Sequence, residues 1–200
     1  MSKFILLGAG GHARSVADVI LSSYKKPEII FFDSNAKTKG SLYGFEVVNT
    51  FPANFKEPII IAIGDNHIRK RIFDKSSGLK FGTVISSRAY ISERSKIGEG
   101  VFIGNFSHVG PEAEIGDNTI LNNNVIIEHE VKIGKHCHVA PNAAISGRCV
   151  LGDLVFVGVG ATIINNINIC SNVTIGAGAT VKDHITEPGT YVGTPARKIK

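Results

Sequence analysis

Residues 97–139 read IGEGVFIGNFSHVGPEAEIGDNTILNNNVIIEHEVKIGKHCHV, and every sixth residue in this stretch, counted from Ile97, is aliphatic. The same spacing extends in both directions without an insertion, from Ile85 to Val181, over seventeen consecutive positions. The fourth residue after each aliphatic anchor is small or β-branched, and glycine often follows the anchor directly. This six-residue period is typical of hexapeptide repeats, which fold as a parallel β-helix.

The repeat predicts a solenoid of short stacked strands with the anchors inside. We expect glycine to supply backbone freedom at the corners. Because no insertion breaks the register, no long loop should leave the solenoid. Cys137 and Cys149 fall on inward positions and are interpreted as packing residues, not as catalytic thiols.

Composition excludes several classes of protein. With 200 residues, 43% hydrophobic and 20% charged, the chain is not disordered. No apolar run approaches the roughly 20 residues that span a bilayer, and no secretory signal begins the chain, so we expect a cytoplasmic protein without membrane insertion. Three cysteines argue against a disulfide framework. The basic residues behind the net charge of +5 are scattered, so no nucleic-acid partner is expected.

Residues 1–82 lack the six-residue period and instead predict a small Rossmann-like α/β domain. The β-helix and tail follow at 83–200. Three buried strands, at 3–7, 28–33 and 58–64, alternate with helices, which indicates a parallel sheet. Its ligand crevice should lie beyond the carboxyl ends of these strands. The loop GAGGHA at 8–13 fits a dinucleotide fingerprint or a plain tight turn. About 80 residues, however, supply only half of a doubly wound sheet, which favours one nucleotide.

Five segments together resemble one family: GAGGHA, FFDSN, AIGDNHIRKRI, IIEHEVKIGKHCHVAP and GTYVGTPARKI. The chain resembles bacterial sugar acetyltransferases of the sialic acid O-acetyltransferase (NeuD) type. It is most similar to the N-acetyltransferases that act on nucleotide-linked 4-amino-4,6-dideoxy sugars. The resemblance implies a left-handed β-helix with three hexapeptides per coil, acetyl-CoA as donor, a homotrimer with active sites between solenoids, and a role in surface glycan or glycoprotein synthesis.

The resemblance also implies site residues. It makes His129 the general base, with Glu130 beside it, and it places His138 at the acetyl-CoA thioester. It assigns CoA-side backbone contacts to Gly147 and Ala177. The nucleotide-sugar contacts that it implies are Gly10, Gly11, His12, Asp33, Ser34 and Gly64.

The residues themselves support this chemistry. His129 lies two positions after an anchor and should stand outside the solenoid, where a neutral imidazole can accept the proton of an attacking amine. Glu128 or Glu130 would fix its tautomer, and the family match favours Glu130. His138 lies half a coil away, so the two rings meet only across protomers. There His138 would donate to the thioester oxygen. Without an activated nucleophile, transfer should be direct, with no acetyl-enzyme.

Three alternatives remain open at this stage. One is O-acetylation of a sialic acid or another sugar, and a second is a nucleotide-sugar-binding protein without catalysis. The third is a zinc-dependent carbonic anhydrase of the gamma type, which shares the solenoid. The solenoid histidines, however, are never spaced by multiples of eighteen, so we expect no metal. The nucleotide base and the sugar stereochemistry are not predicted.

Overall fold

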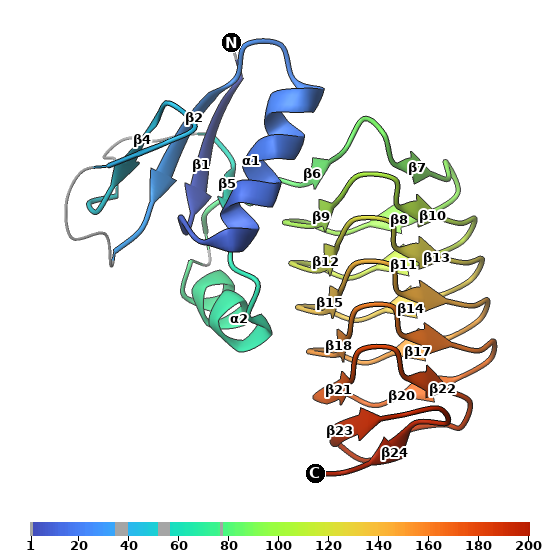
Figure 1. Ribbon diagram of the computed structural model, residues 1–200. Coiled ribbons are helices and arrows are strands. Elements are labelled where there is room, and N and C mark those ends of the chain that lie inside the picture. Colours follow the sequence, from blue (N-terminus) through green and yellow to red (C-terminus); the bar gives the residue numbers. More distant parts are fainter. Residues whose placement is uncertain (1, 35–39, 52–56, 77) are drawn as a thin grey trace.

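A small sheet with two helices packs against the side of a tall stack of short strands (Figure 1). The computed structural model describes residues 2–34, 40–51, 57–76 and 78–200. The change from one architecture to the other lies between the second helix, which ends at Lys75, and the first strand of the stack, which begins at Val84. The α/β domain followed by a β-solenoid confirms the predicted fold class.

The N-terminal sheet has the strand order β3-β4-β2-β1-β5. The three predicted strands, β1 (Lys3–Leu7), β2 (Glu28–Phe32) and β5 (Ile59–Ile61), pair in parallel with β1 in the middle. A hairpin that the sequence did not predict, β3 (Gly40–Leu42) and β4 (Phe45–Val48), extends the sheet beyond β2. The carboxyl ends of β1, β2 and β5 therefore lie side by side, as a ligand crevice requires.

The two helices follow from local sequence. In α1 (Gly11–Ser23), apolar residues recur every three or four positions, from Ala13 to Ile20, and this stripe is buried. Helix α2 (Asn66–Lys75) begins after Asp65, whose side chain accepts a hydrogen bond from the Ile68 N–H at 2.8 Å. This N-cap satisfies one of the amides left unpaired at a helix start.

The stack is a solenoid with three faces, and β6 to β20 complete five coils. The second and third faces follow the first along each coil. The first face consists of β6 (Val84–Ile85), β9 (Phe102–Ile103), β12 (Ile120–Leu121), β15 (His138–Val139), β18 (Phe156–Val157) and β21 (Val173–Ile175), extended by β23 (Gly189–Val192) and β24 (Arg197–Lys198). The second face consists of β7 (Tyr90–Ile91), β10 (His108–Val109), β13 (Ile126–Ile127), β16 (Ala144–Ile145), β19 (Thr162–Ile163) and β22 (Thr180–Val181). The third face consists of β8 (Lys96–Ile97), β11 (Glu114–Ile115), β14 (Lys132–Ile133), β17 (Val150–Leu151) and β20 (Asn168–Ile169).

The aliphatic anchors fill the interior of the solenoid. Each strand pairs in parallel with the strand one coil on, so that Ile127 lies opposite Ile145. Both are completely buried, as are Cys137 and Cys149, which the sequence placed inside. The six-residue period therefore marks the core correctly.

Glycine plays a different role at the corners from the one expected. The corner residues with positive φ are mostly not glycine and include Asn124, His136 and Asn142. The glycines that follow the anchors allow neighbouring coils to approach. A Cβ on Gly116, for example, would lie 2.6 Å from the carbonyl carbon of Gly134. The sequence motif thus reflects close packing of coils, while Asn and other polar residues take the left-handed conformation.

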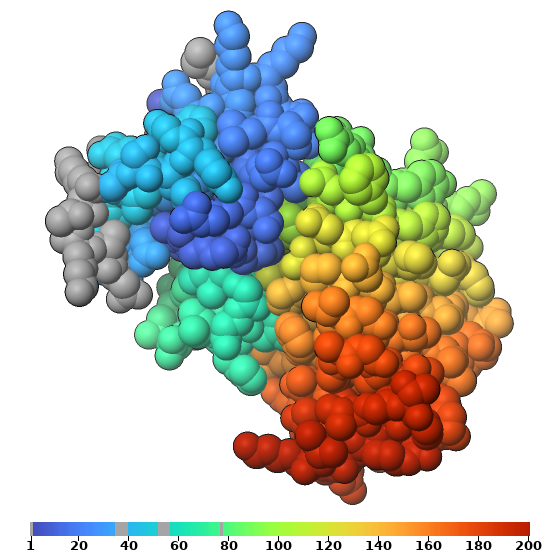
Figure 2. Space-filling view, viewed as in Figure 1, coloured from blue at the N-terminus to red at the C-terminus, as the bar shows by residue number. Residues whose placement is uncertain are grey.

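The α/β domain rests on the first face of the solenoid, as Figures 1 and 2 show. Outward side chains of this face, Val84, Phe102 and Ile120, are buried in one cluster with residues of α1 and β1. The two units therefore share an apolar interface, which holds the ends of the N-terminal strands beside the solenoid. No helix within the described ranges has the length and apolar character needed to cross a membrane.

Candidate active site

His129 lies at the corner between the second and third faces, between β13 and β14. Its Nδ1 is 2.8 Å from Oε2 of Glu130, and Arg148 Nη1 is 3.6 Å from the same oxygen. A carboxylate oxygen accepts, so Nδ1 carries the proton and Nε2 keeps its lone pair. The side chain is 44% exposed, which leaves that lone pair open to a ligand. Of the two flanking acids, Glu130 is the one that contacts the ring.

Gly147 lies directly beside His129, one coil on in the same corner. A Cβ at this position would lie 2.5 Å from both Cε1 and Nε2 of His129, so the ring occupies the space that any side chain would need. In the described part of the chain the Gly147 N–H has no hydrogen-bond partner. At another corner the equivalent N–H of Lys135 donates to Asp153 at 2.7 Å. The corner of His129 therefore combines a free imidazole nitrogen with a free backbone donor.

His138 lies on the first face, on β15, and points toward the α/β domain. Its Nδ1 is 3.1 Å from the carbonyl oxygen of Gly64, and its Nε2 is 3.4 Å from the Asn122 amide nitrogen. Since a carbonyl only accepts, Nδ1 carries the proton. Burial lowers the pKa of His138 to about 4, so the ring is neutral at pH 7. In this tautomer Nε2 accepts, which does not fit the donation to the thioester oxygen expected from sequence.

A second half-buried imidazole, His12, lies beside His138. Their ring centroids are 6.2 Å apart, and His12 also contacts Phe102 edge-on at 5.0 Å. Burial lowers the pKa of His12 to about 3. Its Nε2 has no hydrogen-bond partner among the described residues, although the atom is buried. A buried polar atom without a partner is costly, so this nitrogen is available to form a hydrogen bond with a ligand or a water molecule.

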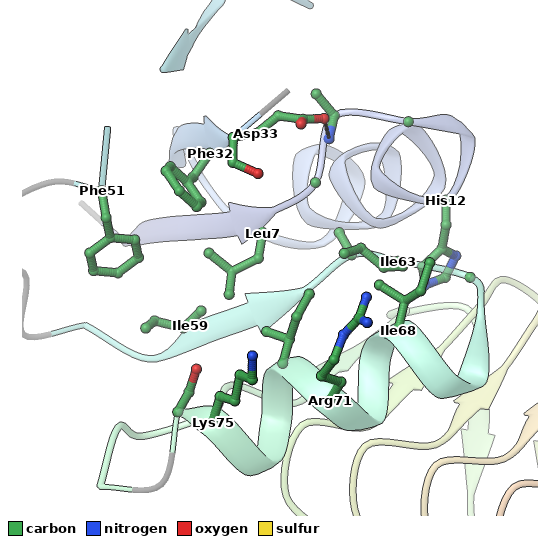
Figure 3. A pocket seen from close by; sticks show the side chains of 18 of the residues that line it. Leu7, His12, Phe32, Asp33, Phe51, Ile59, Ile63, Ile68, Arg71 and Lys75 are labelled. Carbon is green, nitrogen blue, oxygen red and sulfur yellow. Dashed lines mark hydrogen bonds between the residues drawn. The ribbon is translucent and has the colours of Figure 1, made fainter. Parts of the chain in front are cut away.

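A pocket of about 850 Å³ opens beyond the carboxyl ends of β1, β2 and β5 (Figure 3). Leu7, Ile59 and Ile63 form part of its apolar lining. The Asp33 carboxylate accepts a hydrogen bond from the Ala9 N–H at 3.2 Å, which ties the first loop to the second. The pocket brings together all six residues that the family resemblance assigned to the nucleotide sugar: Gly10, Gly11, His12, Asp33, Ser34 and Gly64.

The sequence reasoning missed two cations of this pocket. Arg71 and Lys75, one turn apart on α2, line it, and both side chains extend along its rim (Figure 3). From sequence alone, the basic cluster Arg69-Lys70-Arg71 indicates either a solvated face or a site for a phosphorylated small molecule, and it assigns no residue to the pocket. Helical periodicity separates its members: Arg71 faces the pocket, Lys70 is exposed, and Arg69 is 1% exposed.

The assigned residues fall in three places on one chain. The pocket and His138 lie on the side of the first face, whereas His129 and Gly147 share the corner between the other two faces. Ala177 lies at a third corner, between the first and second faces, next to Gly158. A single chain therefore places His138 beside the nucleotide-side residues but leaves His129, Gly147 and Ala177 apart from them.

Comparison with known proteins bears on both parts of the chain. Residues 3–76 match the family described as PglD N-terminal domain. Residues 94–128 and 112–147 match the family described as bacterial transferase hexapeptide (six repeats). The chain therefore combines a segment that matches the PglD N-terminal domain with a segment that matches the bacterial transferase hexapeptide repeats. These two matches agree with the family that the motifs indicated.

Solved structures of this family agree along the whole chain. The acetyltransferase domain of PglB from Neisseria gonorrhoeae is 28% identical, with all of both chains covered and a TM-score of 0.90. PerB from Caulobacter crescentus, solved with CoA and GDP-perosamine, is 26% identical, with 100% of this chain and 98% of that chain covered and a TM-score of 0.90. The PglB domain has also been solved with acetyl coenzyme A, at 29% identity, 98% coverage of both chains and a TM-score of 0.90.

One curated relative is a longer protein. An uncharacterised protein of Acanthamoeba polyphaga mimivirus is 34% identical over 98 residues. The match spans 48% of this chain and 20% of that protein, so it covers only a fifth of the relative's length.

Among the residues that the structure describes, no three His, Cys, Asp or Glu side chains gather so that they could hold a metal ion. The solenoid histidines lie on different faces, as their spacing indicated.

The thiols provide a test of the packing interpretation. Burial raises the pKa of Cys137 to about 12 and also raises the pKa of Cys149, whereas Cys170 is partly exposed. Because the thiolate is the reactive form, we expect a thiol-reactive dye to label Cys170 alone in the folded protein. All three should react after denaturation. Rapid labelling of Cys137 or Cys149 in the native state would contradict their role as inert core residues.

Proposed function

We propose that this protein transfers an acetyl group from acetyl-CoA to the 4-amino group of a nucleotide-linked 4-amino-4,6-dideoxy sugar. The observation that carries the proposal is the His129 corner, where an oriented imidazole faces outward beside a free N–H. The pocket at the strand ends supports a nucleotide as the other half of the substrate. The structural relatives support the same reaction class, since PerB is solved with CoA and GDP-perosamine.

The proposed reaction is a direct transfer. Nε2 of His129 takes a proton as the sugar amine attacks the thioester carbon, and Glu130 stabilises the imidazolium that forms. The Gly147 N–H is placed to stabilise the oxyanion of the tetrahedral intermediate, the role that sequence reasoning gave to His138. The new C–N bond then remains as the C–S bond breaks, and the thiolate of CoA takes up the proton.

The site requires more than one copy of the chain. In a three-sided prism, the corner between the second and third faces lies opposite the first face, where the nucleotide pocket sits. We therefore propose that a neighbouring copy brings its His129 corner to this pocket, in a homotrimer as the family resemblance implies. Exposed apolar side chains on the second and third faces, among them Ile126 and Val150, are available for such contacts. A monomer by light scattering that is fully active would contradict this arrangement.

The cations on α2 are proposed to bind the phosphates of the nucleotide. Replacing Arg71 and Lys75 together by alanine should raise the KM for the nucleotide sugar about 10²-fold and leave kcat nearly unchanged, because two charge-assisted bonds of roughly 1.5 kcal/mol each are lost from a binding site. Steady-state kinetics measure both constants. Lys70→Ala on the same helix is the matched control, since Lys70 pairs with Asp74 on the surface. An unchanged KM would exclude the phosphate role.

One assay separates the candidate functions. Thiol release from acetyl-CoA is followed with UDP-, dTDP- and GDP-linked 4-amino sugars, and with a hydroxyl-bearing sialic acid. Release only with an amino sugar supports the proposal, whereas release with sialic acid makes the protein an O-acetyltransferase. Binding of a nucleotide sugar without thiol release in any arm would make it a non-catalytic binding protein.

We further propose a cytoplasmic location and a product destined for bacterial surface glycans or glycoproteins. The three free cysteines support the location, since a reducing compartment keeps thiols unpaired.

A further inference from the structure

The guanidinium of Arg69 is buried at the junction of the two domains. It lies at the base of α2 and reaches the first face of the solenoid. Its five N–H groups are fully used, and none of their partners is a carboxylate. The acceptors are the carbonyl oxygens of Asn118 (2.9 Å), His136 (2.9 Å), Cys137 (2.9 Å), Ile63 (3.2 Å) and Gly64 (3.1 Å), and the side-chain oxygen of Asn66 (2.7 Å).

Burying a charged guanidinium costs folding free energy, because the charge loses its hydration. Burial lowers the pKa of Arg69 to about 10, so the charge persists at neutral pH. An apolar side chain of similar size would fasten the two domains without the desolvation penalty. The acceptors indicate a role for the charge. Some belong to the loop at residues 63–64, which lines the pocket, and others belong to the solenoid.

Gly64 connects these elements. Its carbonyl oxygen accepts from Arg69 Nη1 at 3.1 Å and from His138 Nδ1 at 3.1 Å. Gly64 and Ile63 also line the nucleotide pocket, and His138 lies beside the unpartnered Nε2 of His12. The charged guanidinium of Arg69 fixes the orientation of the Gly64 carbonyl. That carbonyl accepts the Nδ1–H hydrogen bond of His138 and so favours the tautomer with the proton on Nδ1.

We propose that Arg69 is a positioning residue that, through the Gly64 carbonyl, sets both the wall of the nucleotide pocket and the tautomer of His138. The inference rests on the proposed function for its effect on catalysis. It goes beyond that function by coupling two parts of the site: the loop that lines the nucleotide pocket and the imidazole on the first face share one hydrogen-bonded carbonyl. Arg69 itself touches neither substrate.

The test compares Arg69→Lys and Arg69→Met with Lys70→Met, which changes an exposed neighbour on the same helix. We expect both Arg69 variants to lower kcat/KM by about 10²-fold, the scale of a small misplacement of reacting groups, with KM for the nucleotide sugar raised. Lys70→Met should stay within about twofold of the parent. A folded Arg69 variant with unchanged kinetics, or one that loses only thermal stability, would overturn the proposal.

A spectroscopic measurement tests the same inference without any activity. Nitrogen-15 chemical shifts of histidine rings report which nitrogen carries the proton, and His138→Gln identifies the His138 signals by their loss. In the unaltered protein Nδ1 should be protonated and Nε2 bare. In Arg69→Lys that preference should weaken. Protonation at Nε2 in the unaltered protein would refute the link even if no Arg69 variant folds. If instead no amino sugar is acetylated, the proposed function fails while this ring signature still decides the role of Arg69.

Discussion

Replacing His129 by alanine is expected to lower kcat by about 10²–10⁴-fold, the usual contribution of a general base, with little change in substrate binding. The expectation rests on the geometry of the ring, which donates from Nδ1 to Glu130 at 2.8 Å and leaves Nε2 free on an open corner. Steady-state thiol release, together with calorimetric binding of acetyl-CoA and nucleotide sugar, measures the two parts of the prediction separately.

The flanking acids provide a matched pair of controls for this experiment. Glu130→Gln should lower kcat because it removes the carboxylate that stabilises the imidazolium, whereas Glu128→Gln should not, since only Glu130 contacts the ring. Near-normal turnover by His129→Ala would remove His129 from the proposed role. Equal losses in the two glutamine variants would argue against the assignment of Glu130.

Gly147→Ala is expected to reduce kcat by about 10²-fold, although it adds only one methyl group. The new Cβ would meet Cε1 and Nε2 of His129 at 2.5 Å, so the ring must move away from its position against the neighbouring coil. A displacement of about 1 Å at a reacting group costs a factor of this size. The φ of Gly147 is not in the left-handed region, so the alanine backbone itself is unstrained.

A double-mutant cycle distinguishes this mechanism from general disruption of the solenoid. If Gly147→Ala acts through the ring, adding it to His129→Ala should cost little more than His129→Ala alone. Additive losses would show that the methyl group damages the site by another route. The melting temperature, measured alongside, should change little because the corner is open to solvent on the ring side.

The solenoid was predictable because its interior accepts one kind of residue at one spacing. Anchors such as Ile127 and Ile145 must be aliphatic in every coil, and this demand repeats without interruption from Ile85 to Val181. The role of the glycines was predicted wrongly because a close approach between coils and a positive φ both favour glycine, so the sequence alone does not distinguish them. The hairpin of β3 and β4 was missed because its strands are short and only partly buried.

The nucleotide pocket was foreseen from topology, since parallel strands end at one edge and their loops converge there. Features that depend on distant contacts were not. The tautomer of His138 depends on Gly64, 74 residues earlier in the chain, and the burial of Arg69 depends on carbonyls of a domain that begins after it. Helical periodicity places Arg69 and Arg71 on different sides of α2, but it does not tell which of them is enclosed by protein and which faces the pocket.

Because strands eighteen residues apart pair in parallel, the height of the solenoid is set by its number of coils. Each coil advances by about 4.8 Å, the distance between hydrogen-bonded strands. The height of the solenoid can therefore change without rearranging the faces only in whole steps of eighteen residues. An insertion of six or twelve residues would keep the anchors inside but move every later strand to a different face. A step inserted between Phe156 and the tail would leave the hydrogen bonds of the junction with the α/β domain intact, including the one from Asn66 to the Val155 carbonyl. One inserted between Asn118 and His136 would separate the carbonyls that converge on a single guanidinium.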